Sequence, residues 1–245
     1  MTQGSGDSFL GGRIAAQQSP DGFRSGTDAV MLAAAVPARD DEELLELGSG
    51  AGVACLCLAA RVSRCRIVGL EISSGQVDLA RRNAAANGME SRIQFANADV
   101  FDLPAAWRRS FDHVFSNPPF HGAEGMTSPH EERARALHDD GRLGQWLAEG
   151  LRRVRAGGTF TAIIRADRLQ EALGAFPATG VTLFPLWPRA GEPAKRIIVQ
   201  ARKNARSPLK LLPGLILHES NGRYAESADA ILREAGSLAL ANPRR

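Results

Sequence analysis

A glycine-rich stretch between a short apolar run and a helical pattern is the feature that most restricts the fold. Glu43–Leu47 is apolar enough for a buried strand, Gly48-Ser49-Gly50-Ala51-Gly52 follows, and residues 53–62 have helical length and composition. Glycines in such a turn let the backbone bend sharply and approach a ligand closely. A strand, a glycine turn and a helix in this order predict an open sheet that binds a ligand beside the carboxyl ends of its strands.

The rest of the chain continues to alternate between strand and helix patterns. Further strands are expected at residues 66–72, 92–95, 112–115, 159–164, 181–186 and 195–201, and further helices at 73–86, 141–155 and 168–175. This alternation predicts the α/β class, with a Rossmann-like, mostly parallel sheet and helices on both faces. The last two strands have no helix between them, which predicts one antiparallel strand at an edge of the sheet.

Two extensions flank this core, which covers about residues 40–203. Residues 1–39 contain a strand or hairpin at 9–17 and a helix at 27–36. Residues 204–245 contain an apolar run at 209–217 and a helix at 225–234. Each extension is too short to form a domain of its own, so we expect residues 1–245 to form a single domain.

Acidic residues follow the first three strands of the core. Glu46 precedes the glycine turn, and Glu71 lies about 20 residues after that turn, where a carboxylate can bind the two hydroxyls of a ribose. Asp99 ends the third strand and could accept the amine of adenine; alternatively, it caps a turn. Glu46 would repel a pyrophosphate, and the glycine spacing is G-x-G-x-G. Both facts favour S-adenosylmethionine over a dinucleotide, although the glycines could also form a plain turn.

The fourth strand ends abruptly on Asn117-Pro118-Pro119-Phe120. Prolines cannot donate to a sheet ladder, so the strand stops where Asn117 reaches the same edge. A turn that ends a strand would explain this stretch alone. Together with the glycine turn and the acidic strand ends, however, it resembles the class I methyltransferases that methylate planar amino nitrogens, over about residues 43–202.

This resemblance implies roles for the residues of the motif. The side-chain oxygen of Asn117 and the carbonyl of Pro118 would accept hydrogen bonds from the amine. Phe120 would stack on the base. The prolines would fix the backbone so that the carbonyl stays aimed at the amine.

The segment from Gly22 to Ala33 is more specific. It resembles the bacterial tRNA (adenine-N6)-methyltransferase family, whose members modify the adenosine just after the anticodon of a valine tRNA. The resemblance places Thr27 and Asp28 beside the methionine end of the cofactor, and Arg24 near its carboxylate or a phosphate. Alternatively, Thr27 and Asp28 cap the following helix, and Arg24 is a solvated surface charge.

The predicted site residues fall into three groups. The catalytic residues are Asn117, Pro118 and Phe120. The cofactor-binding residues are Thr27, Asp28, Glu46, Gly48, Ser49, Gly50, Gly52, Glu71, Ile72, Asp99, Val100 and Asn117. The substrate-binding residues are Arg24, Pro119, Phe120 and Lys203, the last from a basic cluster that could equally be a solvated face. No metal site is expected.

Composition sets wider limits. A net charge of +3 permits a nucleic-acid partner without demanding one. The three cysteines lack a C-x-x-C spacing, which argues against a disulfide framework or a zinc site and suits reduced thiols in a cytoplasmic protein. We expect no signal peptide and no membrane span. Residues 122–140 are either a substrate lid or a solvated loop, and the oligomeric state stays open.

Two other functions remain compatible with the sequence. The first is a methyltransferase acting on another planar amino nitrogen, such as an rRNA or DNA base, a protein glutamine amide or a small molecule. The second is a non-catalytic RNA-binding module that keeps the fold. The intact motif at residues 117–120 argues against the second, because a catalytically inactive copy has no need of it.

Overall fold

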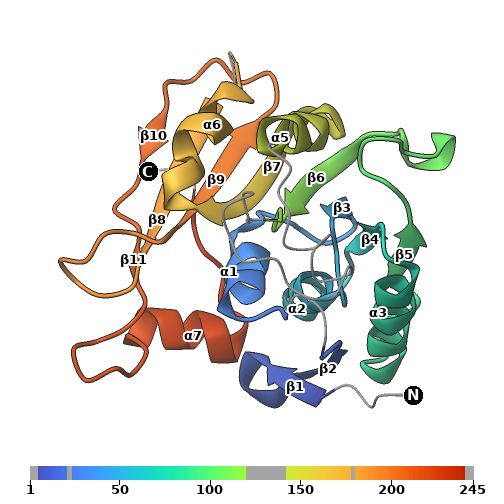
Figure 1. The fold of residues 1–245 in the computed structure, drawn as a ribbon, viewed down its shortest axis with the longest axis horizontal. Coiled ribbons are helices and arrows are strands. Elements are labelled where there is room, and N and C mark those ends of the chain that lie inside the picture. The colour runs from blue at the N-terminus through green and yellow to red at the C-terminus, as the bar shows by residue number, and fades with distance from the viewer. Residues whose placement is uncertain (1–4, 21–23, 120–141, 178–179, 241–245) are drawn as a thin grey trace.

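The computed structural model describes residues 5–20, 24–119, 142–177 and 180–240 (Figure 1). A sheet of nine strands forms its centre, and eight of the strands lie in the order β10-β8-β9-β7-β6-β3-β4-β5, with β11 paired to β8. The strands are β3 (Glu43–Leu47), β4 (Arg66–Glu71), β5 (Ile93–Asn97), β6 (Phe111–Ser116), β7 (Val154–Arg165), β8 (Gly180–Trp187), β9 (Arg196–Arg202), β10 (Lys210–Leu211) and β11 (Leu215–Ile216).

Most neighbouring strands in this sheet are parallel, which confirms the expected fold class. The position of the antiparallel strand was predicted wrongly, because β9 lies inside the sheet, between β7 and β8. It returns along β8 and inserts beside β7, a position that the order of elements along the chain does not reveal. The outer edges are β5 on one side and the short strand β10 on the other.

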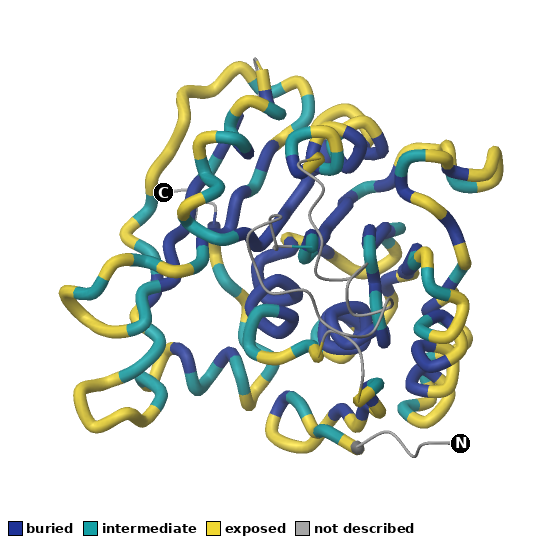
Figure 2. The backbone as a smooth tube through the Cα atoms, viewed as in Figure 1, coloured by how far each residue is buried: buried dark blue, intermediate teal, exposed yellow. Residues whose placement is uncertain are grey.

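Helices cover both faces of the sheet, as Figure 1 shows. One face carries α1 (Thr27–Ala35), α2 (Val53–Arg61), α3 (Ser74–Ala86) and α7 (Glu226–Glu234), and the other carries α5 (Leu143–Arg152) and α6 (Leu169–Gly174). Nearly every residue of α1 and α2 is buried, whereas α3 exposes one side to solvent (Figure 2). Apolar side chains alternating along each strand therefore contribute to two separate cores.

The predicted helix at residues 141–155 ends earlier than expected. It stops at Arg152, and β7 begins at Val154. Gly157 and Gly158, which follow the start of β7, belong to a bulge, because the register between β6 and β7 shifts between Phe111 and His113. A Cβ atom on Gly158 would lie 2.2 Å from the carbonyl oxygen of Asp112. This close approach of two backbones explains the glycine.

The N-terminal extension forms an antiparallel hairpin of β1 (Ser5–Phe9) and β2 (Ile14–Gln18). The hairpin lies beside α3 and the end of α7, where Arg13 donates to the carbonyl oxygen of Glu234 at 3.0 Å. Both extensions contribute buried residues to the core that contains α1 and α2. Among the described residues, no helix is long and apolar enough to cross a membrane.

Candidate active site at the carboxyl edge of the sheet

The glycine turn occupies the space between the end of β3 and the start of α2. Gly48, Gly50 and Gly52 all have positive φ angles, of 71°, 51° and 83°. Residues with a side chain rarely adopt positive φ angles, which explains why glycine recurs at every second position. A Cβ on Gly52 would also lie 2.6 Å from the ring of Phe95.

The backbone N–H groups of all three glycines of this turn and of Ser49 donate within the protein. The N–H groups of Gly48 and Ser49 donate to the carbonyl oxygen of Leu70, at 2.9 and 3.0 Å, and that of Gly52 donates to Ser49. Gly50 N–H donates to the Glu71 carboxylate at 2.9 Å. Amides that already have partners do not form a phosphate cradle. The geometry therefore agrees with the sequence argument against a dinucleotide.

Glu71 ends β4 directly beside this turn. Its second carboxylate oxygen accepts from the backbone N–H of Ser73 at 3.0 Å, so the carboxylate is held by the glycine turn and by the start of α3. Each oxygen keeps a further lone pair for a ligand hydroxyl. The next residue, Ile72, is 65% exposed, and this apolar side chain offers a surface on which a ligand ring could rest.

Asp99 follows β5 at the same edge. Its carboxylate accepts from the N–H of Phe101 at 2.8 Å, so it caps a turn, as the simpler interpretation of the sequence suggested. The side chain is exposed and retains a second oxygen for a ligand, while the neighbouring Val100 is buried. Asp99 and Val100 thus lie where the sequence predicts the adenine end of a cofactor.

Glu46 is buried in the face of the sheet that α2 covers, with 2% of its surface exposed. Its carboxylate accepts a hydrogen bond from Sγ of Cys55 at 2.8 Å. Burial raises the pKa of Glu46 to about 8, against an ordinary value of 4.5. Glu46 therefore binds a proton in the folded protein at neutral pH, until a positive charge reaches it.

We expect Glu46→Gln to stabilise the protein above neutral pH. The unfolded chain loses the Glu46 proton near pH 4.5 while the folded protein keeps it to about pH 8. Stability from this group is therefore complete below pH 4.5, falls as the pH rises to 8, and then levels off. The total loss is on the order of 5 kcal/mol. Urea unfolding at several pH values should show this fall in the wild type and not in Glu46→Gln. The half-exposed Glu43 on the same strand gives the control Glu43→Gln; a wild-type profile in Glu46→Gln would contradict the assignment.

Asn117 follows β6, and the ends of β6, β3 and β4 lie side by side in the sheet. Ser116 pairs with Leu47, and Leu47 pairs with Leu70. The Oδ1 atom of Asn117 and the Oγ atom of Ser49 are buried and have no hydrogen-bond partner among the described residues. Buried polar atoms normally have partners, so Asn117 Oδ1 is available to a ligand at the end of β6. The Oγ atom of Ser49 instead faces β4, because a Cβ on Gly69 would lie 2.9 Å from it. Pro118 is buried and Pro119 half-buried.

Thr27 and Asp28 begin α1 near the same edge. The N-cap position is Gly26, so neither residue fills it. Thr27 Oγ1 lies 3.4 Å from the hydroxyl of Tyr224, and the Asp28 carboxylate accepts from Arg196 at 2.8 Å. Asp28 is thus held by a residue at the first position of β9, on the carboxyl edge of the sheet.

Two substrate residues expected from the sequence are held elsewhere. Arg24 forms an ion pair with Asp7 of β1 at 2.6 Å. Lys203 lies past the end of β9, which runs antiparallel, so it is found beside the start of β7. There its ammonium group donates to the carbonyl oxygens of Arg152 and Val154, at 2.9 and 2.6 Å. The structure therefore does not bring Lys203 together with Asn117, and we leave it out of the site.

Phe120 and the segment 122–140 lie outside the described residues, so their predicted roles stay predictions. Among the residues that are described, no group of three His, Cys, Asp or Glu side chains could hold a metal ion. Cys55, Cys57 and Cys65 are free and buried.

Two asparagines of α3, which the sequence analysis did not single out, join the hairpin to the glycine turn. The amide of Asn83 exchanges two hydrogen bonds with the backbone of Gln17, both at 2.9 Å, and donates a third to the carbonyl of Ala51 at 2.9 Å. Asn87, one helical turn later, does the same for the backbone of Ala15, at 3.1 and 2.7 Å. Asn83 alone reaches the glycine turn.

This difference makes the two asparagines a matched pair for a test. Asn83→Ala should cost about 2–3 kcal/mol of stability, because one buried and two partly buried backbone groups lose their partner. It should also weaken binding of the expected adenosyl ligand, probed with S-adenosylhomocysteine, by about tenfold. Asn87→Ala should lower stability while leaving that affinity within about twofold of wild type. Urea unfolding and titration calorimetry measure both quantities. Equal affinity losses in the two variants would mean that the contact with Ala51 does not support the ligand site.

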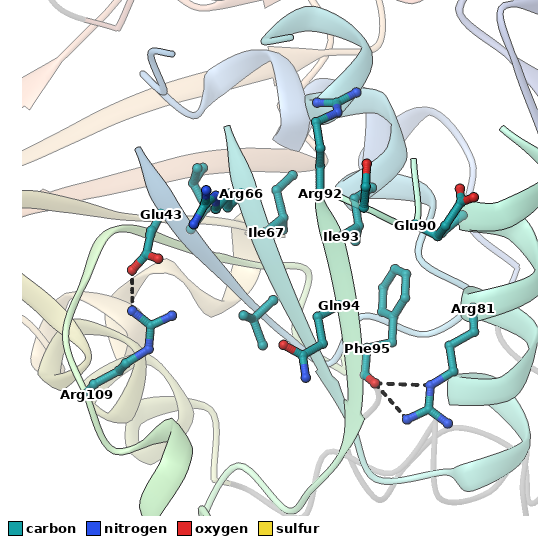
Figure 3. Close-up of a pocket in the computed structure, with 14 residues that line it drawn as sticks. Glu43, Arg66, Ile67, Arg81, Glu90, Arg92, Ile93, Gln94, Phe95 and Arg109 are labelled. Carbon is teal, nitrogen blue, oxygen red and sulfur yellow. Dashed lines mark hydrogen bonds and ion pairs between the residues drawn. The ribbon is translucent and has the colours of Figure 1, made fainter. Parts of the chain in front are cut away.

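A groove of about 590 Å³ lies at the opposite end of the sheet, around the first residues of β3, β4 and β5 (Figure 3). Its charged lining consists of Glu43, Arg66, Arg81, Glu90, Arg92 and Arg109. Glu43 pairs with Arg109, and Arg81 donates to the carbonyl oxygen of Phe95 at 3.2 and 2.9 Å (Figure 3). None of the predicted site residues lines this groove, so it is not part of the candidate active site.

Comparison with known proteins agrees with the site and the fold. The family model of the methyltransferase small domain matches residues 19–144, just over half of the 245 residues. The chain therefore belongs to the methyltransferase small domain family, which confirms that it is a methyltransferase.

Two similar relatives carry a more particular name. The tRNA1(Val) (adenine(37)-N6)-methyltransferase of Bacteroides thetaiotaomicron is 27% identical over 211 residues, covering 83% of this chain and 88% of the relative. The protein of the same name from Porphyromonas gingivalis is 29% identical over 235 residues, covering 89% and 91%. A crystal structure of a predicted O-methyltransferase from Agrobacterium tumefaciens superimposes with a TM-score of 0.73 and 26% identity, over 86% of this chain and 98% of the other. The family resemblance and the fold class expected from the sequence are both confirmed.

Proposed function

We propose that this protein transfers a methyl group from S-adenosylmethionine to the exocyclic N6 amine of adenosine 37 in a valine tRNA. The names of its relatives support the substrate. The observation that carries the chemistry is the buried Oδ1 atom of Asn117, which has no partner among the described residues and follows the strand next to the glycine turn. An acceptor left in this state suits an amine that arrives with the substrate.

The residues at the carboxyl edge match the groups of this cofactor. S-adenosylmethionine supplies a methyl group on a positively charged sulfonium. Glu71 would accept hydrogen bonds from the ribose hydroxyls, and Asp99 would accept one from the amine of adenine. Ile72 and Val100 would lie beside the adenine ring. Glu46 and Asp28 would face the cationic methionine end. A positive charge there would convert Glu46 to its charged form, against the effect of burial.

The acceptor amine needs help from the protein, because its lone pair is delocalised into the adenine ring. Asn117 Oδ1 and the carbonyl of Pro118 would each accept one N–H of the amine. Two such bonds favour a pyramidal nitrogen whose lone pair points at the methyl carbon. Because Pro118 and Pro119 restrict the backbone, the carbonyl keeps its direction. Positioning, rather than a strong base, would therefore supply most of the rate. As the bond from nitrogen to the methyl carbon forms, the bond from that carbon to sulfur would break, leaving S-adenosylhomocysteine. The cationic nitrogen would then lose one proton to water.

Phe120 and Arg24 would add contacts to the substrate. Phe120 would stack on the adenine. Arg24 would reach a phosphate only by giving up its contact with Asp7. Because both extensions share the main core, we treat residues 1–245 as a single methyltransferase domain. A tRNA substrate implies a cytoplasmic protein, which the three buried free thiols suit.

The test is methylation of an unmodified valine tRNA transcript. The protein is incubated with the transcript and S-adenosylmethionine, and the RNA is digested to nucleosides for mass spectrometry. N6-methyladenosine should appear, and a transcript with guanosine in place of adenosine 37 should gain none. A folded protein that binds S-adenosylhomocysteine but leaves the transcript unmethylated would overturn the tRNA substrate. Label found in protein or in other nucleic acids would then point to another planar amine.

A further inference from the structure

Trp146 contacts three parts of the candidate site at once. It lies on α5, near the start of that helix. A Cβ on Gly48 would lie 3.0 Å from its ring, so the indole packs under the first glycine of the turn. Its Nε1–H donates to the hydroxyl of Ser116 at 2.9 Å. Its ring also meets Phe101, in the loop after Asp99, edge to face with centroids 5.8 Å apart.

The hydrogen bonds from Trp146 have a fixed direction. An indole N–H can only donate, and a carbonyl can only accept. Ser116 is fully buried and passes the chain on, accepting from Trp146 and donating to the carbonyl oxygen of Leu47 at 2.7 Å. Leu47 is the last residue of β3, and Ser116 is the last residue of β6. This chain of bonds therefore connects the two strand ends that carry the glycine turn and Asn117.

The backbone ladder between β6 and β3 ends at the pair of Ser116 and Leu47. Pro118 and Pro119, which follow Asn117, have no N–H to continue it. The side chain of Ser116 therefore reinforces the last pair of the ladder, and Trp146 orients its hydroxyl. A shift of this link would change the separation between Asn117 and the glycine turn.

We propose that Trp146 is a positioning residue that sets the distance between the cofactor-binding turn and Asn117. This inference rests on the proposed function, since it assumes methyl transfer between those two places. Trp146 itself touches neither reacting group; it acts through Ser116 and Gly48. A misplacement of about 1 Å between reacting groups can reduce a rate strongly while leaving the binding of each partner nearly intact.

The test compares Trp146→Phe, Ser116→Ala and the double variant. Phenylalanine keeps most of the packing and removes only the donor. Each single change should lower kcat by about tenfold with the tRNA transcript. The double variant should be no slower than the singles, because both remove the same link. Affinity for S-adenosylhomocysteine, measured by calorimetry, should stay within about threefold of wild type. Trp107→Phe, which removes an indole outside this link, should leave kcat unchanged.

A second readout does not depend on turnover. The chain has three tryptophans, so Trp107→Phe with Trp187→Phe leaves Trp146 as the sole indole. Its fluorescence should change as S-adenosylhomocysteine binds, because the indole packs against Gly48. Wild-type kcat in both single variants, or a loss of stability without a loss of kcat, would overturn the inference, and so would unchanged fluorescence when calorimetry shows binding. A wild type that binds no S-adenosylhomocysteine would instead overturn the proposed function together with this inference.

Discussion

Asn117→Ala is expected to lower kcat for tRNA methylation by about a thousandfold. The variant lacks the Oδ1 acceptor that would hold the amine, so the nitrogen keeps its delocalised lone pair. Affinity for S-adenosylhomocysteine should change by less than about threefold, since other residues hold that ligand. Single-turnover kinetics with the valine tRNA transcript, together with calorimetry, would separate the two effects.

The stability of Asn117→Ala should not fall with its activity. The Oδ1 atom of Asn117 is buried and has no partner among the described residues, and such an atom costs about 1–3 kcal/mol in a folded protein. Its removal should therefore leave the unfolding free energy unchanged or raise it. Asn117→Asp keeps an acceptor at the same place and should retain more activity than Asn117→Ala. Equal rates for the wild type and Asn117→Ala would eliminate Asn117 from the chemistry.

Glu71→Gln should reduce the affinity for S-adenosylhomocysteine by about a hundredfold, corresponding to the loss of hydrogen bonds to a charged acceptor. Both oxygens of Glu71 accept backbone N–H groups, from Gly50 and Ser73. An amide in the same place must direct its NH2 group at one of these donors in either orientation. The substitution therefore disturbs the glycine turn as well as the predicted ribose contact.

Calorimetry at a fixed pH gives the affinity directly. Glu90→Gln is the control, because it removes a carboxylate from an exposed position outside the site. If Glu71→Gln bound the ligand as tightly as this control, the ribose role of Glu71 would be wrong. Because kcat at saturating ligand should fall much less than affinity, the Glu71 result differs in kind from that of Asn117.

Features tied to local sequence were predictable to within a residue or two. Glu43–Leu47 is the strand expected, and the helix expected at residues 73–86 is α3, with Ser73 as its N-cap. These features depend on short-range rules: apolar runs, glycine conformation and capping. The convergence of Glu71 and Asn117 at one edge followed from the parallel strand order.

Features that depend on tertiary position could not be predicted in this way. A tryptophan at a helical apolar position looks like any core residue, so Trp146 gave no signal. Asn83 and Asn87 fit the pattern of a solvated helix face equally well. For both asparagines and for Trp146 the deciding fact is which other segment lies opposite. Lys203 is different: it follows the final strand, and the antiparallel direction that the sequence predicts there already places it at the end of the sheet away from Asn117.

The contact between α3 and β2 brings together two different spacings. Four residues of helix advance about 6.0 Å, and two residues of strand advance about 6.6 Å. Asn83 and Asn87 on the helix therefore match Gln17 and Ala15 on the strand once, but a further repeat would drift out of step. A helix can thus set the register of a strand over a single repeat. In this protein that repeat also fixes the position of Gln18 on β2. The side chain of Gln18 exchanges two hydrogen bonds with the backbone of Ser25, just before α1.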